Sequence, residues 1–162
     1  MQRKLAIATL AVVLFATTSA GQMPAANAAG GGGCSLANVA GAFGFTYTGV
    51  AITPSGQVPV AAVGRYSSDS AGDFVGSEVN SLAGTPASQT ILGKITVQPD
   101  CGGRLVAKVY QQGSLVRTSY IHLQYDSEAS EVRIIFEKLV LPDGSTLPVV
   151  ITGDGTSLSH GG

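Results

Sequence analysis

The feature that most constrains the fold is a succession of short runs rich in β-branched and aromatic residues, each separated from the next by a turn rich in Gly, Pro, Asp or Ser. No segment carries an apolar stripe with a period of 3.6 residues over a helical length. Because parallel strands need long crossover connections, neighbouring strands are expected to pair antiparallel. Eight such strands are predicted: Ala42–Ile52, Val58–Ser68, Phe74–Ala83, Thr90–Val97, Leu105–Tyr110, Leu115–Tyr125, Glu131–Leu141 and Thr146–Thr152.

The side chains within these runs alternate between two faces of a sheet, and the number of runs favours a sheet that is closed on itself. In the first run Phe43, Phe45 and Tyr47 share one face. A flat meander of this size would leave two exposed edges, and closure removes them. The predicted fold is therefore all-β, an eight-stranded antiparallel up-and-down meander closed into a barrel. Several strands are apolar on both faces, as in Val132–Leu139, so a β-sandwich remains the alternative, and an outer face covered by another molecule is a second explanation.

The fourth and fifth runs form a hairpin within Gln89–Gln112, and its turn holds one of the two cysteines. Pro99 presets its own φ, and Gly102 and Gly103 tolerate positive φ. Cys101 lies in this turn, and its only intrachain partner is Cys34.

The N-terminus has the pattern of a secretory signal peptide. A short basic start is followed by an apolar run from Leu5 to Ala16 and then by small residues. Cleavage after Ala28 or after Ala20 fits the pattern, whereas a membrane anchor would need about 20 apolar residues. The protein is thus expected to be secreted or periplasmic, with no membrane span in the mature chain. Lipidation of Cys34 is disfavoured because Gly31–Gly33 precede it without a Leu.

Export leads to a prediction about the cysteines and the domains. In an oxidising compartment Cys34 and Cys101 are expected to form a disulfide. Metal binding is the rival, but these cysteines with His122 and His160 lack ligand spacing, so no metal site is predicted.

The expected organisation is a signal peptide over 1–28, a Gly-rich lead-in with a short turn over 29–40, one barrel domain over 41–156 and a flexible tail over 157–162.

Charge and motifs exclude several classes of function. Charged residues make up 12% of the chain and hydrophobic ones 44%, which indicates a folded domain. Loss of Arg3 and Lys4 with the signal peptide leaves seven basic against ten acidic residues, so nucleic acid is not an expected partner. No nucleophile elbow, phosphate-binding loop, dinucleotide fingerprint or zinc-protease motif occurs. No catalytic residue and no cofactor are therefore predicted.

Polar residues in the middle of strands are the remaining candidates for a site. Glu78 and Asn80 share one face of the third strand, and Tyr120 and His122 share one face of the sixth. If these faces point inward, the four residues form a polar floor in an apolar cavity and bind a ligand. His122 beside a carboxylate would also suit general acid or base chemistry. The alternative is that each residue lies on the solvent side of a half-buried strand.

The chain resembles a group of small exported bacterial proteins, most of them hypothetical, over most of its expected mature length. The resemblance rests mainly on turn and packing residues: Cys34, Leu36, Gly41–Phe45, Ala62–Arg65, Asp69–Gly72, Gly76, Leu92–Val97 and Asp100–Gly103. It implies a barrel similar to the calycin or allene-oxide-cyclase kind, whose members bind or cyclise small apolar molecules. No catalytic residue of those families matches a position in this sequence.

Three functional hypotheses follow. The first is a secreted barrel that binds a small, largely apolar ligand. The second is a non-enzymatic envelope or extracellular protein that assembles through its outer face by self-association. The third is a cyclase- or isomerase-like enzyme, which rests on fold analogy alone.

Overall fold

The structure is a computed structural model that describes residues 33–158. These residues form one short helix and nine strands. The predicted signal peptide, the first part of the lead-in and residues 159–162 lie outside the described residues. The elements are α1 Leu36–Val39, β1 Gly41–Thr53, β2 Gly56–Ser68, β3 Asp73–Leu82, β4 Thr85–Val97, β5 Gly102–Gln111, β6 Ser114–Tyr125, β7 Glu131–Val140, β8 Thr146–Leu147 and β9 Val149–Ser157.

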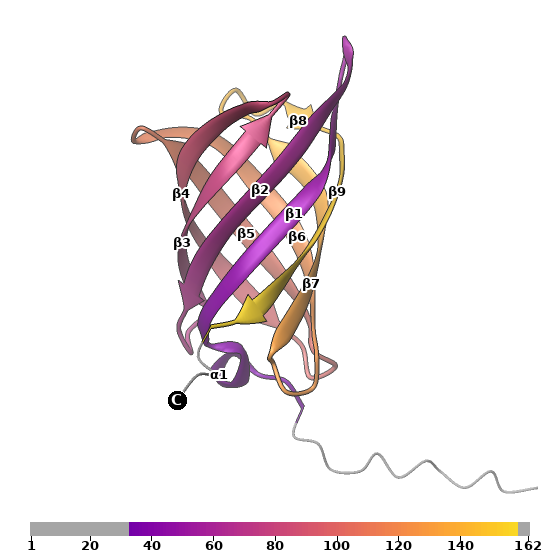
Figure 1. Cartoon of the computed structure of the whole chain (residues 1–162). Helices are drawn as coiled ribbons and strands as arrows, with labels where there is room; N and C mark the ends of the chain where they lie inside the picture. Colours follow the sequence, from indigo (N-terminus) through magenta and orange to yellow (C-terminus); the bar gives the residue numbers. More distant parts are fainter. Residues whose placement is uncertain (1–32, 159–162) are drawn as a thin grey trace, which may run out of the picture. The chain divides into compact units, whose positions relative to one another are not determined.

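The sheet closes into an antiparallel up-and-down barrel of eight strands, as predicted, and not into a sandwich (Figure 1). Strands β1 to β7 pair in sequence order, and β9 pairs with both β7 and β1. The two-residue strand β8 pairs only with the end of β7. Each main strand thus has a neighbour on both sides, which leaves no exposed sheet edge along the barrel wall.

The last predicted strand differs from the structure at both of its ends. Pro148 separates β8 from β9 because proline has no N–H to donate to a sheet ladder. Its carbonyl oxygen still accepts a hydrogen bond from Ile52 N at 2.9 Å. The strand then continues to Ser157, and Leu158 N donates to Ala42 O at 2.8 Å. The backbone of these two residues, which are expected to begin the tail, thus completes the pairing with β1.

Two tight turns connect strands at the same end of the barrel. Ala83 and Gly84 join β3 to β4, and Gln112 and Gly113 join β5 to β6, all with positive φ. Two-residue turns of this conformation match the twist of the strands they connect. The predicted fourth strand begins at Thr90, whereas in the structure β4 already begins at Thr85.

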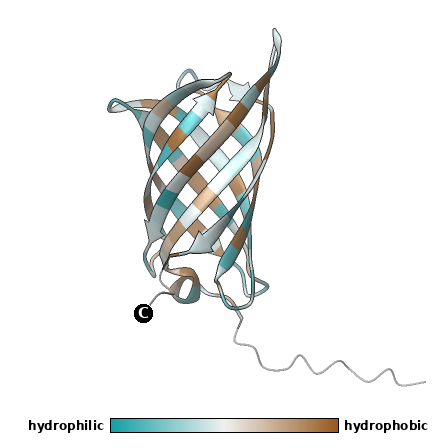
Figure 2. Ribbon diagram, viewed as in Figure 1, coloured by the Kyte–Doolittle hydropathy of each residue, from teal (hydrophilic) through white to brown (hydrophobic). Residues whose placement is uncertain are grey.

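The barrel interior is filled by one face of every main strand. Phe43, Phe45 and Tyr47 all point inward from β1, which confirms that they share a face. The hydropathy of the chain alternates along several strands in Figure 2, as expected for a wall with an inner and an outer face. Within the interior, the Tyr66 ring stacks on the Phe43 ring with a centroid distance of 5.1 Å and on the Phe74 ring at 4.6 Å.

One end of the barrel, called the closed end, is covered by α1 and by the Cys34–Cys101 disulfide (Figure 1). Ser35 caps α1 by accepting a hydrogen bond from Asn38 N. Val39 is almost completely buried. Cys34 N donates to Pro99 O at 3.3 Å, so backbone and disulfide both attach the start of the described chain to the β4–β5 turn. The predicted bond between the two cysteines is present.

The other end, called the open end, carries the β1–β2, β3–β4 and β5–β6 turns and the short strand β8. The β1–β2 hairpin extends beyond its neighbours there (Figure 1). No helix within residues 33–158 is long and apolar enough to cross a membrane.

Candidate functional site

A cavity of about 470 Å³, called the cup, lies at the open end. Its walls are mainly apolar and come from most of the strands. The side chains of Ala51 and Ala87 are short at positions where larger residues would extend into this space. The other apolar wall residues are Val60, Leu82, Val116, Phe136, Leu139, Leu141, Leu147 and Ile151.

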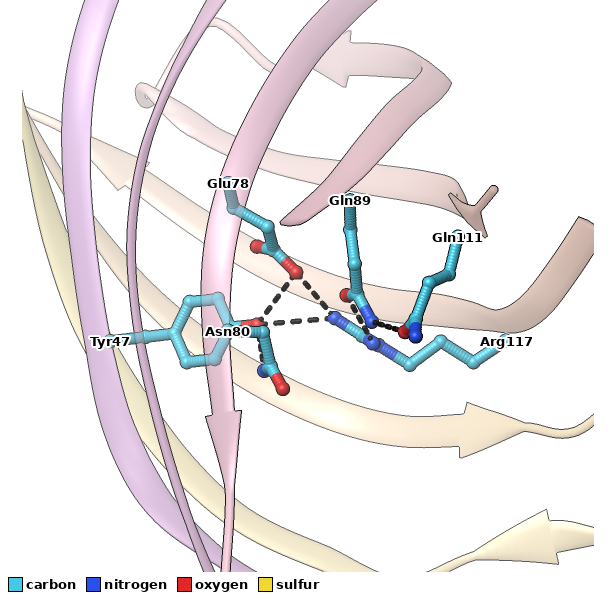
Figure 3. A network of polar contacts seen from close by, with 6 residues as sticks. All are labelled: Tyr47, Glu78, Asn80, Gln89, Gln111 and Arg117. Carbon is cyan, nitrogen blue, oxygen red and sulfur yellow. Dashed lines mark hydrogen bonds and ion pairs between the residues drawn. The ribbon is translucent and has the colours of Figure 1, made fainter. Parts of the chain in front are cut away.

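The inner boundary of the cup is a hydrogen-bonded group, called the floor network, which consists of Tyr47, Glu78, Asn80, Gln89, Gln111 and Arg117 (Figure 3). All of these residues except Glu78 line the cup. The network crosses the barrel, since its members come from β1, β3, β4, β5 and β6.

An ion pair lies at the centre of the floor network. Arg117 Nη2 donates to Glu78 Oε1 at 2.6 Å, and the two side chains are 13% and 2% exposed. Arg117 also donates from Nη2 to Tyr47 Oη at 3.1 Å and from Nη1 to Gln89 Oε1 at 2.8 Å. Charges this deeply placed need both a partner and hydrogen bonds, and the network supplies both.

A β-bulge brings Arg117 into the interior. Val109 pairs with Arg117 while Tyr110 pairs with Leu115, which leaves Val116 as an extra residue in β6. Val116 and Arg117 therefore both face the cup although they are adjacent in sequence.

Glu78 reaches the interior opposite a glycine. Gly64 is its register partner in β2. A Cβ atom on Gly64 would lie 2.6 Å from Phe45 Cζ and 2.9 Å from Glu78 Cβ. The missing side chain thus leaves space for both the aromatic ring and the carboxylate.

The Tyr47 hydroxyl connects the ion pair to Asn80. It donates to Glu78 Oε1 at 3.1 Å and accepts from Asn80 Nδ2 at 3.1 Å. Burial, and then the negative charge of Glu78, raise the Tyr47 pKa well above its usual value. The hydroxyl consequently keeps its proton at neutral pH and serves as a donor to the carboxylate.

A second, much smaller space, called the lower chamber, lies on the other side of the floor network. Its volume is about 40 Å³, and most of its lining side chains are apolar. The lining includes the Ser119 hydroxyl, which is buried and has no hydrogen-bond partner within residues 33–158. Such a space is too small for an organic ligand. Of these two interior spaces, only the cup has the volume of a ligand site.

The predicted site residues divide between the two sides of the barrel wall. Glu78 and Asn80 point inward and meet in the floor network. The expectation that Tyr120 and His122 join them in the interior is wrong, because the inward residues of β6 in this part are Ser119 and Ile121. In an extended strand the neighbouring positions must then face outward.

Outside the barrel, Tyr120 and His122 belong to a surface cluster around Glu137. His122 Nε2 lies 3.4 Å from Glu137 Oε2, and its side chain is 51% exposed. Arg104 and Lys138 also pair with Glu137, and the Lys138 ammonium group lies 4.8 Å from the centre of the Tyr120 ring. Exposed ion pairs of this kind typically contribute little to stability. Within residues 33–158, no three His, Cys, Asp or Glu side chains are grouped as metal ligands.

Sequence reasoning missed four members of the floor network: Tyr47, Gln89, Gln111 and Arg117. Tyr47 is predicted only to share a strand face with Phe43 and Phe45, and the sequence marks Arg117 only as a charged residue within the predicted strand Leu115–Tyr125. The contact between Gln89 and Gln111 could have been predicted, because these residues lie at the start and near the end of the predicted hairpin. Hairpin pairing brings the two ends of a hairpin close together.

Comparison with known proteins supports the fold alone. No protein-family model matches the sequence, and no curated protein sequence is significantly similar to it. A solved structure of EF1p2_mFAP2b bound to DFHBI matches with a TM-score of 0.52 and 14% sequence identity, over 76% of this chain and 99% of that one. This likeness shows the fold alone, which is a closed antiparallel barrel of eight strands. The disulfide is compatible with an extracellular or periplasmic protein.

Proposed function

We propose that this protein is an exported barrel that binds one small, largely apolar molecule in the cup. The observation that carries the proposal is the cavity of about 470 Å³ with apolar walls and the floor network at its inner boundary. Ligand pockets in proteins are typically about 300–1,000 Å³, with mostly apolar linings and a few polar groups that fix orientation.

The driving force for binding is burial of the ligand's apolar surface against the walls. Asn80 and Gln111 then contact the polar end of the ligand, because both line the cup at its inner boundary. Tyr120 and His122 take no part, since they lie on the outer wall. The similar barrel EF1p2_mFAP2b holds DFHBI, which is an example of a barrel of this general form with a small molecule bound.

Export is part of the same proposal. It rests on the signal-peptide pattern over residues 1–28, and the disulfide between Cys34 and Cys101 supports it because such bonds persist in oxidising compartments. The mature chain would then consist of the barrel and its short lead-in.

A cup-filling substitution tests the site. Ala87 lines the cup, and the next residue, Ser88, points outward from the same strand. Ala87→Phe should abolish uptake of octanol, measured by calorimetry, and should remove any small molecule that co-purifies with the protein in native mass spectrometry. Ser88→Phe is the matched control and should leave binding unchanged. Equal binding by both variants, or no binding by the unmodified protein to any apolar probe, would contradict the proposal.

A second candidate function, self-association, is favoured by one observation on the outer wall. Val63 lies directly opposite Val79, and Val75 lies opposite Leu92; all four side chains are exposed. Both pairs lie on the outer face of β2, β3 and β4, with the polar residues Arg65, Ser77 and Thr90 between them. Analytical ultracentrifugation tests this candidate: a concentration-dependent dimer that is lost in Val63→Lys supports assembly through this surface, and a monomer at all concentrations excludes it.

A further inference from the structure

The two charged members of the floor network determine which of its groups donate hydrogen bonds and which accept them. A guanidinium group only donates hydrogen bonds, and an ionised carboxylate only accepts them. Arg117 therefore requires the carbonyl oxygen of Gln89 to face it, at 2.8 Å. The Gln89 amide nitrogen must then point away, and it donates to Gln111 Oε1 at 3.0 Å.

The same reasoning orients Asn80. The Tyr47 hydroxyl uses its single proton on Glu78, so Tyr47 Oη can only accept from Asn80. Asn80 consequently presents Nδ2 to Tyr47 at 3.1 Å. The ion pair thus determines which atom of each side-chain amide is the oxygen and which is the nitrogen.

Each chain of hydrogen bonds ends in one free group. Gln111 Nε2 is a donor and Asn80 Oδ1 is an acceptor, and neither has a hydrogen-bond partner within residues 33–158. Figure 3 shows the Asn80 oxygen pointing away from the Tyr47 hydroxyl. Since Asn80 and Gln111 both line the cup, these amide ends are polar groups that a ligand meets there, beside the Thr85 hydroxyl and the remaining N–H groups of Arg117.

The floor network is also electrically balanced. The positive charge of Arg117 is paired with Glu78 at 2.6 Å, within the barrel. Glu78 does not line the cup, but its carboxylate already neutralises the guanidinium charge that a ligand anion would approach. The anion would also lose its hydration on entering the apolar walls without gaining a free positive charge.

We infer that the cup selects an electrically neutral ligand whose polar end both donates and accepts a hydrogen bond, such as a hydroxyl or a primary amide, and discriminates against carboxylates. This inference rests on the proposed binding function. It assigns Gln111 as the donor to the ligand, Asn80 as the acceptor, and Glu78 as the residue that prevents Arg117 from binding an anion.

A matched set of eight-carbon probes tests the inference by calorimetry at neutral pH. Octanol and octanamide should bind the unmodified protein at least about tenfold more tightly than octanoate, because only the carboxylate must bury an uncompensated charge. Octanoate binding should strengthen as the pH falls through the pKa of octanoic acid itself, because the neutral acid both donates and accepts. Octanoate that binds as tightly as octanol at neutral pH overturns the inference and leaves the proposed function intact.

A charge-removing variant sharpens the test. Glu78→Gln leaves Arg117 without its counter-charge, so octanoate should gain about tenfold or more in affinity relative to octanol. An unchanged ratio in a folded variant overturns the inference. If Glu78→Gln does not fold, as judged by circular dichroism, the pH series on the unmodified protein decides alone. Failure of all three probes to bind the unmodified protein overturns the proposed function, and the inference with it.

Discussion

The closed end of the barrel is filled and covalently tied, whereas the open end holds a cavity of about 470 Å³. At the closed end the rings of Phe43, Tyr66 and Phe74 stack in series, and α1 packs below them. At the open end short side chains such as Ala51 and Ala87 leave the interior unfilled. The closed end thus supplies stability, which allows the open end to keep a cavity that costs packing energy.

The floor network forms the boundary between these two regions. It satisfies polar groups that would otherwise be buried without partners, and it separates the cup from the lower chamber of about 40 Å³. The following predictions test whether stability and binding are divided between the two ends in this way.

The largest expected effect is on stability at the closed end. Phe43 is 1% exposed, so Phe43→Ala should lower the free energy of unfolding by about 3–5 kcal/mol. Leu82 at the rim of the cup is 50% exposed, and Leu82→Ala should cost less than about 1 kcal/mol. Urea denaturation of both variants measures the difference. Equal losses at the two ends would show that the open end contributes as much to stability as the closed end.

Removal of the disulfide should have the next largest effect. Cys34 and Cys101 are separated by 67 residues, and the chain-entropy model gives about 4 kcal/mol for closing such a loop. The double variant Cys34→Ser/Cys101→Ser should unfold at lower urea concentration but bind octanol with unchanged affinity while it remains folded. Loss of binding by the folded variant would show that the closed end also shapes the cup.

A smaller effect is expected on binding at the open end. Gln111→Leu removes the proposed donor to the ligand and should weaken octanol binding by about 0.5–1.5 kcal/mol, the usual net contribution of one hydrogen bond. His122→Leu on the outer wall is the control and should leave affinity unchanged in calorimetry. A loss of affinity in His122→Leu would contradict the assignment of the site to the barrel interior.

The smallest effect concerns a turn at the closed end. Asp126 accepts hydrogen bonds from Ser130 Oγ at 2.6 Å and from the backbone N of Ser130 and Glu131. The Ser130 side chain, followed by the Glu131 backbone, lowers the Asp126 pKa. A lowered pKa stabilises the fold above the unfolded value of about 4, and this contribution is lost as pH falls through the folded pKa.

Asp126→Asn should therefore be less stable than the unmodified protein at neutral pH, by well under about 1 kcal/mol because water screens the exposed carboxylate. The difference should vanish in acid. Thermal unfolding across a pH series measures it. The equivalent open-end substitution is Asp143→Asn, since Ser145 lowers the Asp143 pKa in the same manner. A difference that grows in acid would contradict the sign of both shifts.

The strands and the barrel were predictable because the alternation of side chains between two faces is a local property of the sequence. Phe43, Phe45 and Tyr47 are two residues apart, so their common face follows from the geometry of one extended strand. The disulfide was predictable because Cys34 has only one possible partner in the chain. Pro148 was visible in the sequence, yet its interruption of the last strand was not predicted.

The inner face of β6 was not predictable from alternation. The bulge at Val116 adds one residue, so the face that begins the strand is not the face that ends it. A shift of one residue exchanges inside and outside, so the side on which Tyr120 and His122 lie could not be fixed without knowing where the bulge is. The floor network also joins five strands, and contacts between such distant segments depend on barrel closure and not on local pattern.

The most direct test of the division between the two ends is a nuclear magnetic resonance titration of the protein with octanol. Saturable shifts are expected for the methyl groups that line the cup, such as those of Leu82 and Leu147, and for the Gln111 side-chain amide. The methyl groups of Ile95 and Leu105, which line the lower chamber, should remain unchanged. Shifts centred on Ile95 and Leu105, or on the exposed Val63 and Val79, would contradict the central claim that the open end is the binding site.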